Sequence, residues 1–219
     1  YQKSNLFMKK EVELMKHFVG IVGGTNVGST NRKLLQYMAQ HFASEAEIEL
    51  VEIGNLPVFN KPQNKVLPSA VLPLVEKIEQ ADGVIISTPE YDHSAPAALM
   101  NVLNWLSYGV YPFVDKPVMI TGCSYGTLGS SRAQAHLRQM LDAPELKARI
   151  MPSSEFLLGH SLAAFDDQGQ LQDAEQVQRL TGLFHDFCLF VDITKQLTET
   201  LEADKVAAAN FDWKKGSAL

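Results

Sequence analysis

The chain alternates short apolar segments with amphipathic segments of helical period, and this alternation restricts the possible folds most. Residues 18–22, 83–88 and 117–121 are continuous apolar runs, which is typical of parallel strands buried on both faces. Residues 30–43 and 95–107 instead repeat their apolar side chains every three or four positions. A strand–helix alternation of this kind predicts a parallel sheet covered by helices on both faces.

The remaining elements complete the same pattern. The sequence predicts further strands at 48–53 and 148–151, and further helices at 69–81, 130–142 and 171–200, the last broken near Gly182. Five parallel strands joined by right-handed crossovers fit an α/β three-layer sandwich with flavodoxin-like strand order 2-1-3-4-5.

A single domain is expected over residues 15–200. Residues 1–14 are interpreted as residues left from cloning or an N-terminal arm. Residues 201–219 are interpreted as a C-terminal tail, whose Phe211 and Trp213 either dock on the body or a partner subunit, or fray.

Composition excludes several classes of function. There are 19 Lys and Arg against 25 Asp and Glu, a net charge of −6, which disfavours a duplex nucleic-acid partner. Cys123 and Cys188 form neither a disulfide framework nor a metal-ligand pattern, so buried, reduced thiols and no metal are expected. No apolar run approaches the roughly 18 residues of a membrane span, and no signal-peptide core is present, so a cytoplasmic protein without membrane contact is expected.

The first of three loops that carry chemistry follows the strand at 18–22. Its glycines allow a tight turn, and the N–H groups at the start of the next helix attract an anion. The sequence lacks the Gly-Lys-Ser/Thr of nucleotide triphosphatases and the G-x-G-x-x-G spacing. The alternative is a structural turn with Ser29 as helix N-cap. The candidate phosphate-binding residues are Gly24, Thr25, Asn26, Ser29, Thr30 and Asn31.

The second loop, residues 89–96, follows the strand at 83–88. Proline at both ends limits its conformations, and Tyr91 offers a flat apolar ring with a polar tip. Ser94 is expected to cap the next helix, and Pro96 to occupy its first turn. The candidate ligand-binding residues are Pro89, Glu90, Tyr91 and His93, with His93 contributing through its backbone only.

The third loop, residues 124–131, follows the strand at 117–121. Its small residues permit close approach of the backbone to a ring system, and its candidates are Ser124, Tyr125, Gly126 and Gly129. The alternative is a flexible turn with Ser130 or Ser131 as N-cap. Arg132, just inside the next helix, is expected to be solvated or ion-paired, and the alternative is that it contacts an anion.

In the order 2-1-3-4-5, these loops follow three adjacent strands and converge on one cleft. A phosphate cradle beside backbone amides and an aromatic wall has the form of an FMN site. A flavin carries the redox chemistry itself, so no catalytic acid–base pair is required, and we expect none.

The sequence resembles the NADPH-dependent FMN reductase family over about residues 17–195. The family turn Pro-Glu-Tyr-x-x-Ser-x-Pro matches residues 89–96, and its Asn-x-x-x-Trp feature matches Asn101 and Trp105. The chain departs from the family at Asn26, where the family usually has a phosphate-binding Arg, and at Gly129-Ser130 in place of two glycines. A third family feature is approximated by Ser124, Gly126, Gly129, Arg132, Ala133, Gln134, Leu137 and Arg138.

The resemblance implies an FMN-dependent oxidoreductase that takes hydride from NADPH or NADH. The electrons would pass to a small-molecule acceptor: a quinone, an azo compound, a metal oxyanion or free flavin. It also implies a homodimer or homotetramer, with helix 95–107 and residues 105–108 as candidate contacts. Residues 56–62 and 108–113 are expected to line the substrate opening. The alternative is a flavodoxin-like electron carrier or flavin-binding module without NAD(P)H turnover.

Overall fold

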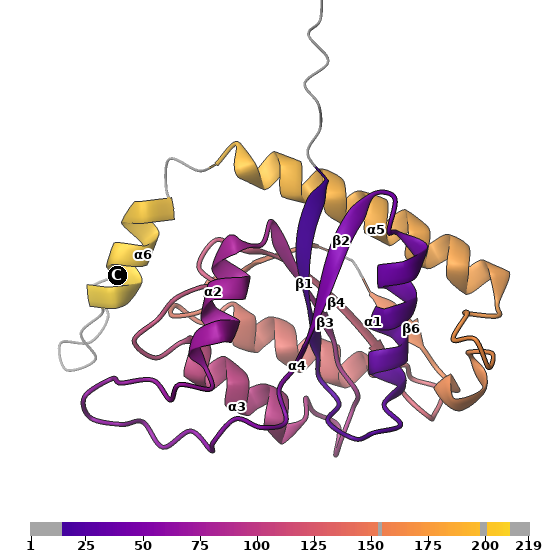
Figure 1. Ribbon diagram of the computed structural model, residues 1–219, viewed down its shortest axis with the longest axis horizontal. Helices are drawn as coiled ribbons and strands as arrows, with labels where there is room; N and C mark the ends of the chain where they lie inside the picture. The colour runs from indigo at the N-terminus through magenta and orange to yellow at the C-terminus, as the bar shows by residue number, and fades with distance from the viewer. Residues whose placement is uncertain (1–14, 153–154, 198–200, 211–219) are drawn as a thin grey trace, which may run out of the picture.

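The fold is described from a computed structural model, which describes residues 15–152, 155–197 and 201–210. Five strands form a parallel sheet in the order β2-β1-β3-β4-β5, as predicted, and a sixth strand also pairs with β4. Figure 1 shows the sheet with helices on both sides. The strands are β1 (Lys16–Val22), β2 (Ala46–Glu52), β3 (Gly83–Ser87), β4 (Pro117–Cys123), β5 (Arg149–Ile150) and β6 (Phe156–Leu158).

The helices cover the two faces of the sheet, and each face forms a separate hydrophobic core with its helices. Helices α1 (Thr30–His41) and α5 (Ala174–Lys195) pack on one face, and α2 (Leu72–Gln80), α3 (Ala97–Leu106) and α4 (Ser131–Leu141) pack on the other. Alternate residues of β1 serve the two cores, since Phe18 and Val22 face α1 and α5 whereas Val19 and Ile21 face the other helices. The continuous apolar runs therefore arise from strands that are buried on both faces.

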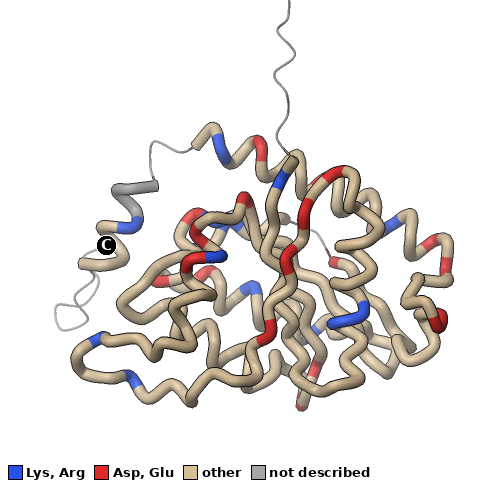
Figure 2. The backbone as a smooth tube through the Cα atoms, in the orientation of Figure 1, with Lys and Arg blue, Asp and Glu red and all other residues tan. Residues whose placement is uncertain are grey.

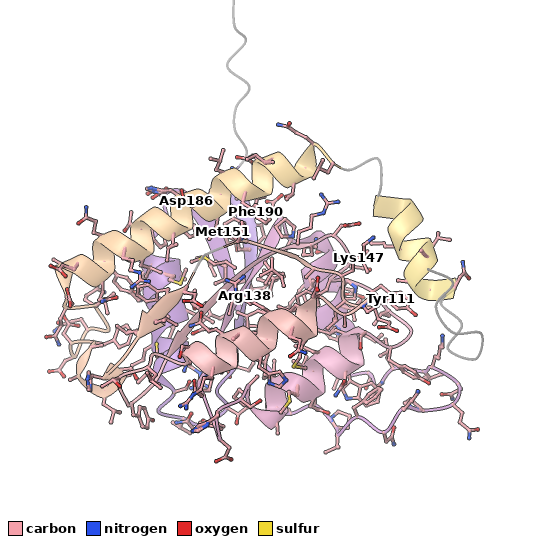
Figure 3. The ribbon with its side chains drawn as sticks, turned by 180° about the vertical axis from the view of Figure 1, so that it is seen from behind. Tyr111, Arg138, Lys147, Met151, Asp186 and Phe190 are labelled. Carbon is pink, nitrogen blue, oxygen red and sulfur yellow. The ribbon has the colours of Figure 1, made fainter. Side chains whose placement is uncertain are left out.

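The strand predicted at 148–151 is present as β5, but a second short strand at the same edge was not predicted from the sequence. β5 pairs with the start of β4, at Pro117–Val118, and β6 pairs with its end, at Thr121–Cys123. Two short strands thus share one edge of the sheet. Helix α4 is tied to this edge, since the Arg138 guanidinium donates a hydrogen bond of 3.0 Å to the Met151 carbonyl just beyond β5 (Figure 3).

One further sequence prediction is corrected at the C-terminal end. Helix α5 is continuous through Gly182, where an added Cβ would meet no atom within 4 Å. Within the predicted tail, residues 201–210 form helix α6, which was not predicted from the sequence, and its Ala208 is buried. The predictions for residues 1–14 and for Phe211 and Trp213 lie outside the described residues.

The other edge of the sheet, β2, carries several acidic side chains. Its sequence AEIELVE places three glutamates on one strand, and Figure 2 shows acidic positions following one another along it. Charged side chains on an edge strand discourage pairing with a second sheet.

Candidate functional site

A cavity of about 460 Å³ opens at the carboxyl ends of β1, β3 and β4, where the three predicted loops meet. This size lies within the range of small-molecule and cofactor sites. Predicted residues that line it are Asn26, Ser29, Thr30, Asn31, Pro89, Glu90, Tyr91, Ser124, Tyr125 and Gly126.

Four predicted residues lie outside the cavity lining, and four lining residues were not among the predicted site residues. Gly24, Thr25, His93 and Gly129 are absent from the lining, while Cys123, Thr127, Leu128 and Arg132 belong to it. Thr127 and Leu128 fall between the predicted Gly126 and Gly129. Their position within the third loop could therefore have identified them as lining residues.

The first loop presents a set of unpaired backbone donors to solvent. Among the described residues, none of the N–H groups of Thr25, Asn26, Val27 and Gly28 donates to a protein acceptor, and all four residues are exposed. Ser29 is the N-cap of α1, as in the structural alternative for this loop, because its hydroxyl accepts from the Arg32 N–H at 3.3 Å. A helix N-terminus with free N–H groups beside it is suited to a phosphate.

Asn31 and Thr30 use their side chains inside the protein. The Asn31 carboxamide oxygen accepts from the Ser87 hydroxyl and the Cys123 N–H, both at 2.9 Å, and its amide donates to the Cys123 carbonyl. Thr30 shares a buried 2.8 Å hydrogen bond with the Ser161 hydroxyl. Both side chains fix α1 against the carboxyl ends of β3 and β4 and the segment after β6, and so hold the walls of the cavity together.

The N-terminus of α4 also faces the cavity, but a carboxylate already occupies it. Glu90 accepts from the backbone N–H groups of Arg132 and Ala133, at 3.0 and 3.4 Å, and pairs with the Arg132 guanidinium. Burial raises the pKa of Glu90, and these hydrogen bonds outweigh burial, so its pKa lies below the ordinary value. Arg132 is thus ion-paired, one of the two states expected for it, and the N-terminus of α1 remains for an anionic ligand.

The turn after β3 is tighter than the sequence indicated. Tyr91 and Ser94 exchange backbone hydrogen bonds of 3.1 and 2.9 Å across Asp92 and His93, which both have positive φ, as a type I′ turn requires. The predicted capping role of Ser94 is wrong. Pro96 takes the N-cap position of α3 without a side-chain bond, and the Ser94 hydroxyl bonds His136 on α4 instead.

The third loop rests on the unpredicted strand β6. The Ser124 N–H donates to the Leu158 carbonyl at 3.0 Å, and Gly129, at φ +56°, lies so close to Leu157 that a Cβ would be 2.4 Å from its carbonyl carbon. Only glycine fits that position. Ser130 holds the N-cap position of α4, but its hydroxyl makes no capping bond, which agrees with Glu90 supplying the cap.

Tyr91 and Tyr125 flank the cavity with half-exposed rings. Cys123 is fully buried, and burial raises the pKa of its thiol well above the ordinary value, so it stays protonated. Cys188 is only partly buried. Within the described residues, no three His, Cys, Asp or Glu side chains are grouped as a metal site.

Three of the residues expected at the substrate opening do not line the cavity at the ends of β1, β3 and β4. Phe59, Tyr108 and Tyr111 line a separate cavity of about 380 Å³. Trp105, expected at a subunit contact, is buried, and its indole N–H donates to the Pro57 carbonyl at 2.7 Å. Its ring therefore anchors the loop after β2 within the same subunit. In the part of the chain that the structure describes, no helix has the length and apolar character to cross a membrane.

An open parallel sheet with a phosphate-type loop and an aromatic-flanked cavity at its switch point defines a flavodoxin-like protein. The family model for NADPH-dependent FMN reductase matches residues 17–163. The chain belongs to this family, and is an oxidoreductase with FMN as cofactor and a nicotinamide nucleotide as reductant.

Relatives and solved structures agree with this assignment. The NADH:(hydroxy)cinnamate reductase subunit CrdA of Vibrio ruber is 54% identical over 84% of this chain and 91% of that protein. A quinone reductase of Escherichia coli is 35% identical over 81% of this chain and 96% of that protein. The flavoenzyme NAD(P)H:(acceptor) oxidoreductase FerB of Paracoccus denitrificans superposes with a TM-score of 0.71 at 28% identity, covering 83% of this chain and 98% of FerB.

Proposed function

We propose that the cavity at the ends of β1, β3 and β4 holds FMN, with its phosphate on the first loop and its ring system between the second and third loops. The observation that carries this placement is the row of unpaired N–H groups from Thr25 to Gly28 beside the N-terminus of α1. When bound, FMN accepts hydride from the nicotinamide nucleotide and passes the electrons to an acceptor.

The residues around the cavity bind and orient the cofactor. The backbone of the first loop and the N-terminus of α1 hold the phosphate. The loops at 89–91 and 124–126 enclose the ring with backbone groups and the Tyr91 and Tyr125 rings. The Glu90 carboxylate is held by Arg132 and the end of α4, so it keeps α4 from competing for the phosphate.

The test is an absorbance spectrum of the purified protein after reconstitution with FMN, before and after anaerobic NADH. Retained flavin absorbance that bleaches on adding NADH supports both the cofactor and the reaction. A protein that does not retain FMN contradicts the placement. Flavin that is retained but not reduced supports an electron carrier instead.

NADH is the proposed reductant in preference to NADPH. Asn26 carries no charge at the position where the family usually has an arginine, so one cationic group for a 2′-phosphate is missing. Two relatives are also named as NADH-dependent, CrdA of Vibrio ruber and a flavin reductase subunit of Lactobacillus johnsonii. We expect a higher kcat/KM for NADH, and a shift towards NADPH in Asn26→Arg; equal values for both nucleotides in the wild type contradict the proposal.

The proposed acceptor is a small planar aromatic molecule of the quinone class. The half-exposed Tyr91 and Tyr125 rings flank the cavity, where such a molecule can stack, and several relatives are named quinone reductases. Steady-state rates with a quinone, an azo dye and free FMN rank the acceptors. Because two relatives are named as subunits, slow turnover with all three acceptors despite fast flavin reduction favours a protein acceptor.

We also propose a cytoplasmic homodimer or homotetramer. Exposed apolar side chains lie on loops and a short 3-10 helix at or near the cavity end of the sheet, where a second subunit can cover them: Val27, Val58, Tyr91, Leu128 and Leu162. Light scattering on the FMN-loaded protein gives the mass, and a monomer at micromolar concentration contradicts this part of the proposal.

A further inference from the structure

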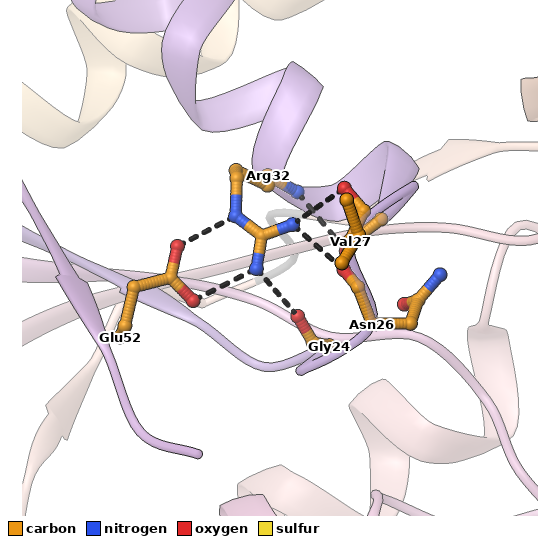
Figure 4. A network of polar contacts seen from close by, with 6 residues as sticks. Gly24, Asn26, Val27, Arg32 and Glu52 are labelled. Carbon is orange, nitrogen blue, oxygen red and sulfur yellow. Dashed lines mark hydrogen bonds and ion pairs between the residues drawn. The ribbon is translucent and has the colours of Figure 1, made fainter. Parts of the chain in front are cut away.

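Arg32 lies on the first turn of α1 and contacts the loop between β1 and α1, the proposed phosphate loop. No sequence motif indicated these contacts. Its guanidinium donates to the carbonyls of Asn26 at 2.7 Å, Val27 at 3.2 Å and Gly24 at 3.5 Å (Figure 4). These carbonyls belong to the loop whose N–H groups from Thr25 to Gly28 make no hydrogen bond within the described residues.

Glu52 fixes the same guanidinium from the other side. Its two carboxylate oxygens accept from Arg32 Nε at 2.6 Å and from a terminal nitrogen at 2.8 Å. Glu52 is the last residue of β2 and pairs in register with Val22 at the end of β1. The guanidinium is thereby held by the sheet, and its planar fork suits this two-sided geometry.

The orientation of the carbonyls determines where the neighbouring N–H groups point. The described peptide bonds are all trans, and in a trans peptide the C=O and the following N–H point in opposite directions. With the carbonyls of Gly24, Asn26 and Val27 turned to Arg32, the N–H groups of Thr25, Val27 and Gly28 point away from it. Arg32 itself is not part of the cavity lining, whereas Asn26 is.

We propose that Arg32, anchored by Glu52, is the positioning residue that sets the phosphate loop for FMN. It acts through the backbone, turning the N–H groups of Thr25, Val27 and Gly28 towards the phosphate. The chain thus has a cation behind the loop, whereas position 26, where the family usually has an arginine, carries no charge. The inference rests on the placement of FMN proposed above.

The test compares the affinities of FMN and riboflavin, which differ only in the phosphate, by flavin fluorescence titration of the apoprotein. We expect Arg32→Gln to raise the Kd of FMN at least tenfold and that of riboflavin less than twofold. Loss of affinity for both ligands alike overturns the inference, because it indicates a general loss of the cavity. Unchanged affinity for FMN also overturns it.

Two further variants separate positioning from simple charge. Arg32→Lys keeps the positive charge but loses the planar guanidinium, so we expect FMN to bind at least fivefold more weakly than to the wild type. Binding as tight as in the wild type overturns the positioning role of Arg32. Glu52→Ala removes a negative charge near the proposed phosphate position, but it also releases the Arg32 guanidinium. Because we propose that the position of the guanidinium matters more, we expect weaker FMN binding, and tighter binding overturns the inference.

The control is Lys77→Gln, which removes a cation that pairs with Glu49 of β2 away from the loop. It makes the same change in net charge as Arg32→Gln, and we expect both flavins to bind as in the wild type. If the wild type binds neither flavin, the proposed function itself fails. That result is distinct from a wild type that binds FMN and an Arg32 variant that binds it equally well.

Discussion

Glu90 shows how a single side chain sets the chemistry available at the cavity. Its carboxylate caps α4, and its pKa is lowered because hydrogen bonds from Arg132 and Ala133 outweigh the effect of burial. A carboxyl group whose pKa is lower in the folded state than in the unfolded state stabilises the protein at pH values above its unfolded pKa of 4.5. This stabilisation is lost as the pH falls through the pKa of the folded state.

We therefore expect Glu90→Gln to lower the free energy of unfolding by about 1 kcal/mol at neutral pH, through the loss of a charged helix cap. The difference from the wild type should shrink as the pH falls below 4.5. Urea unfolding between pH 7 and pH 3 measures it, with the exposed Glu76→Gln as control. A difference that is independent of pH contradicts the role of the charge.

His93 is held at φ +65° in the turn after β3, a conformation that costs energy for a residue with a Cβ. His93→Gly creates Asp-Gly, the pair that type I′ turns favour, so we expect the free energy of unfolding to rise by about 0.5–1 kcal/mol. His93→Ala removes the imidazole but keeps the Cβ, and should show no gain. Thermal unfolding of both variants checks this, and a gain in the alanine variant contradicts backbone strain as the cause.

At the scale of elements, the buried carboxamide of Asn31 helps to fix α1 to the sheet. Asn31→Ala leaves the Cys123 backbone groups and the Ser87 hydroxyl without their partner. Buried polar groups left unpaired are costly, so we expect a loss of about 2–4 kcal/mol in urea unfolding. The exposed Asn104→Ala on α3 is the control, and a similar small loss in both variants contradicts the anchoring role.

Helix α5 carries glycine in its interior at Gly182, where a Cβ would meet open space. Gly182→Ala should raise the free energy of unfolding by about 1 kcal/mol, since alanine has the higher helix propensity. Gly83→Ala is the matched contrast, because its Cβ would lie 2.9 Å from the Phe187 ring and should destabilise. Chemical denaturation of both variants decides, and a loss on Gly182→Ala indicates a break in the helix.

At the scale of the whole molecule, the cavity joins loops from three strands, so a ligand there links their stabilities. FMN at 100 times its Kd should stabilise the native state by about 2.7 kcal/mol. We expect the Tm to rise with FMN concentration, and to rise less with riboflavin at equal concentration. Differential scanning calorimetry measures both; equal shifts contradict a phosphate contact.

The sheet order and the meeting of three loops could be predicted because they follow from local patterns. Apolar runs at 18–22, 83–88 and 117–121 required strands covered on both faces, and parallel connection brings their carboxyl ends together. The split between β5 and β6 could not be predicted. Two and three residues of strand carry too little periodic signal.

The polar contacts of the site could not be predicted from the sequence either, because the residues that form each contact are distant in the sequence. Asn31 looked like a phosphate ligand, and its side chain instead bonds Ser87 and Cys123. Ser94 looked like a helix cap, and it instead bonds His136. Each of these partners is set by how a helix packs on the sheet.

By itself, the sequence determined the class of fold, the cavity's position and the family, since hydrophobic period and turn residues act over a few neighbouring positions. Only the tertiary structure decided how the loop between β1 and α1 is held. Arg32 reaches Glu52 20 residues away, and Glu90 reaches α4 42 residues away. Hydrogen bonds act over about 3 Å in space, and only the packed sheet brings such distant residues within that range.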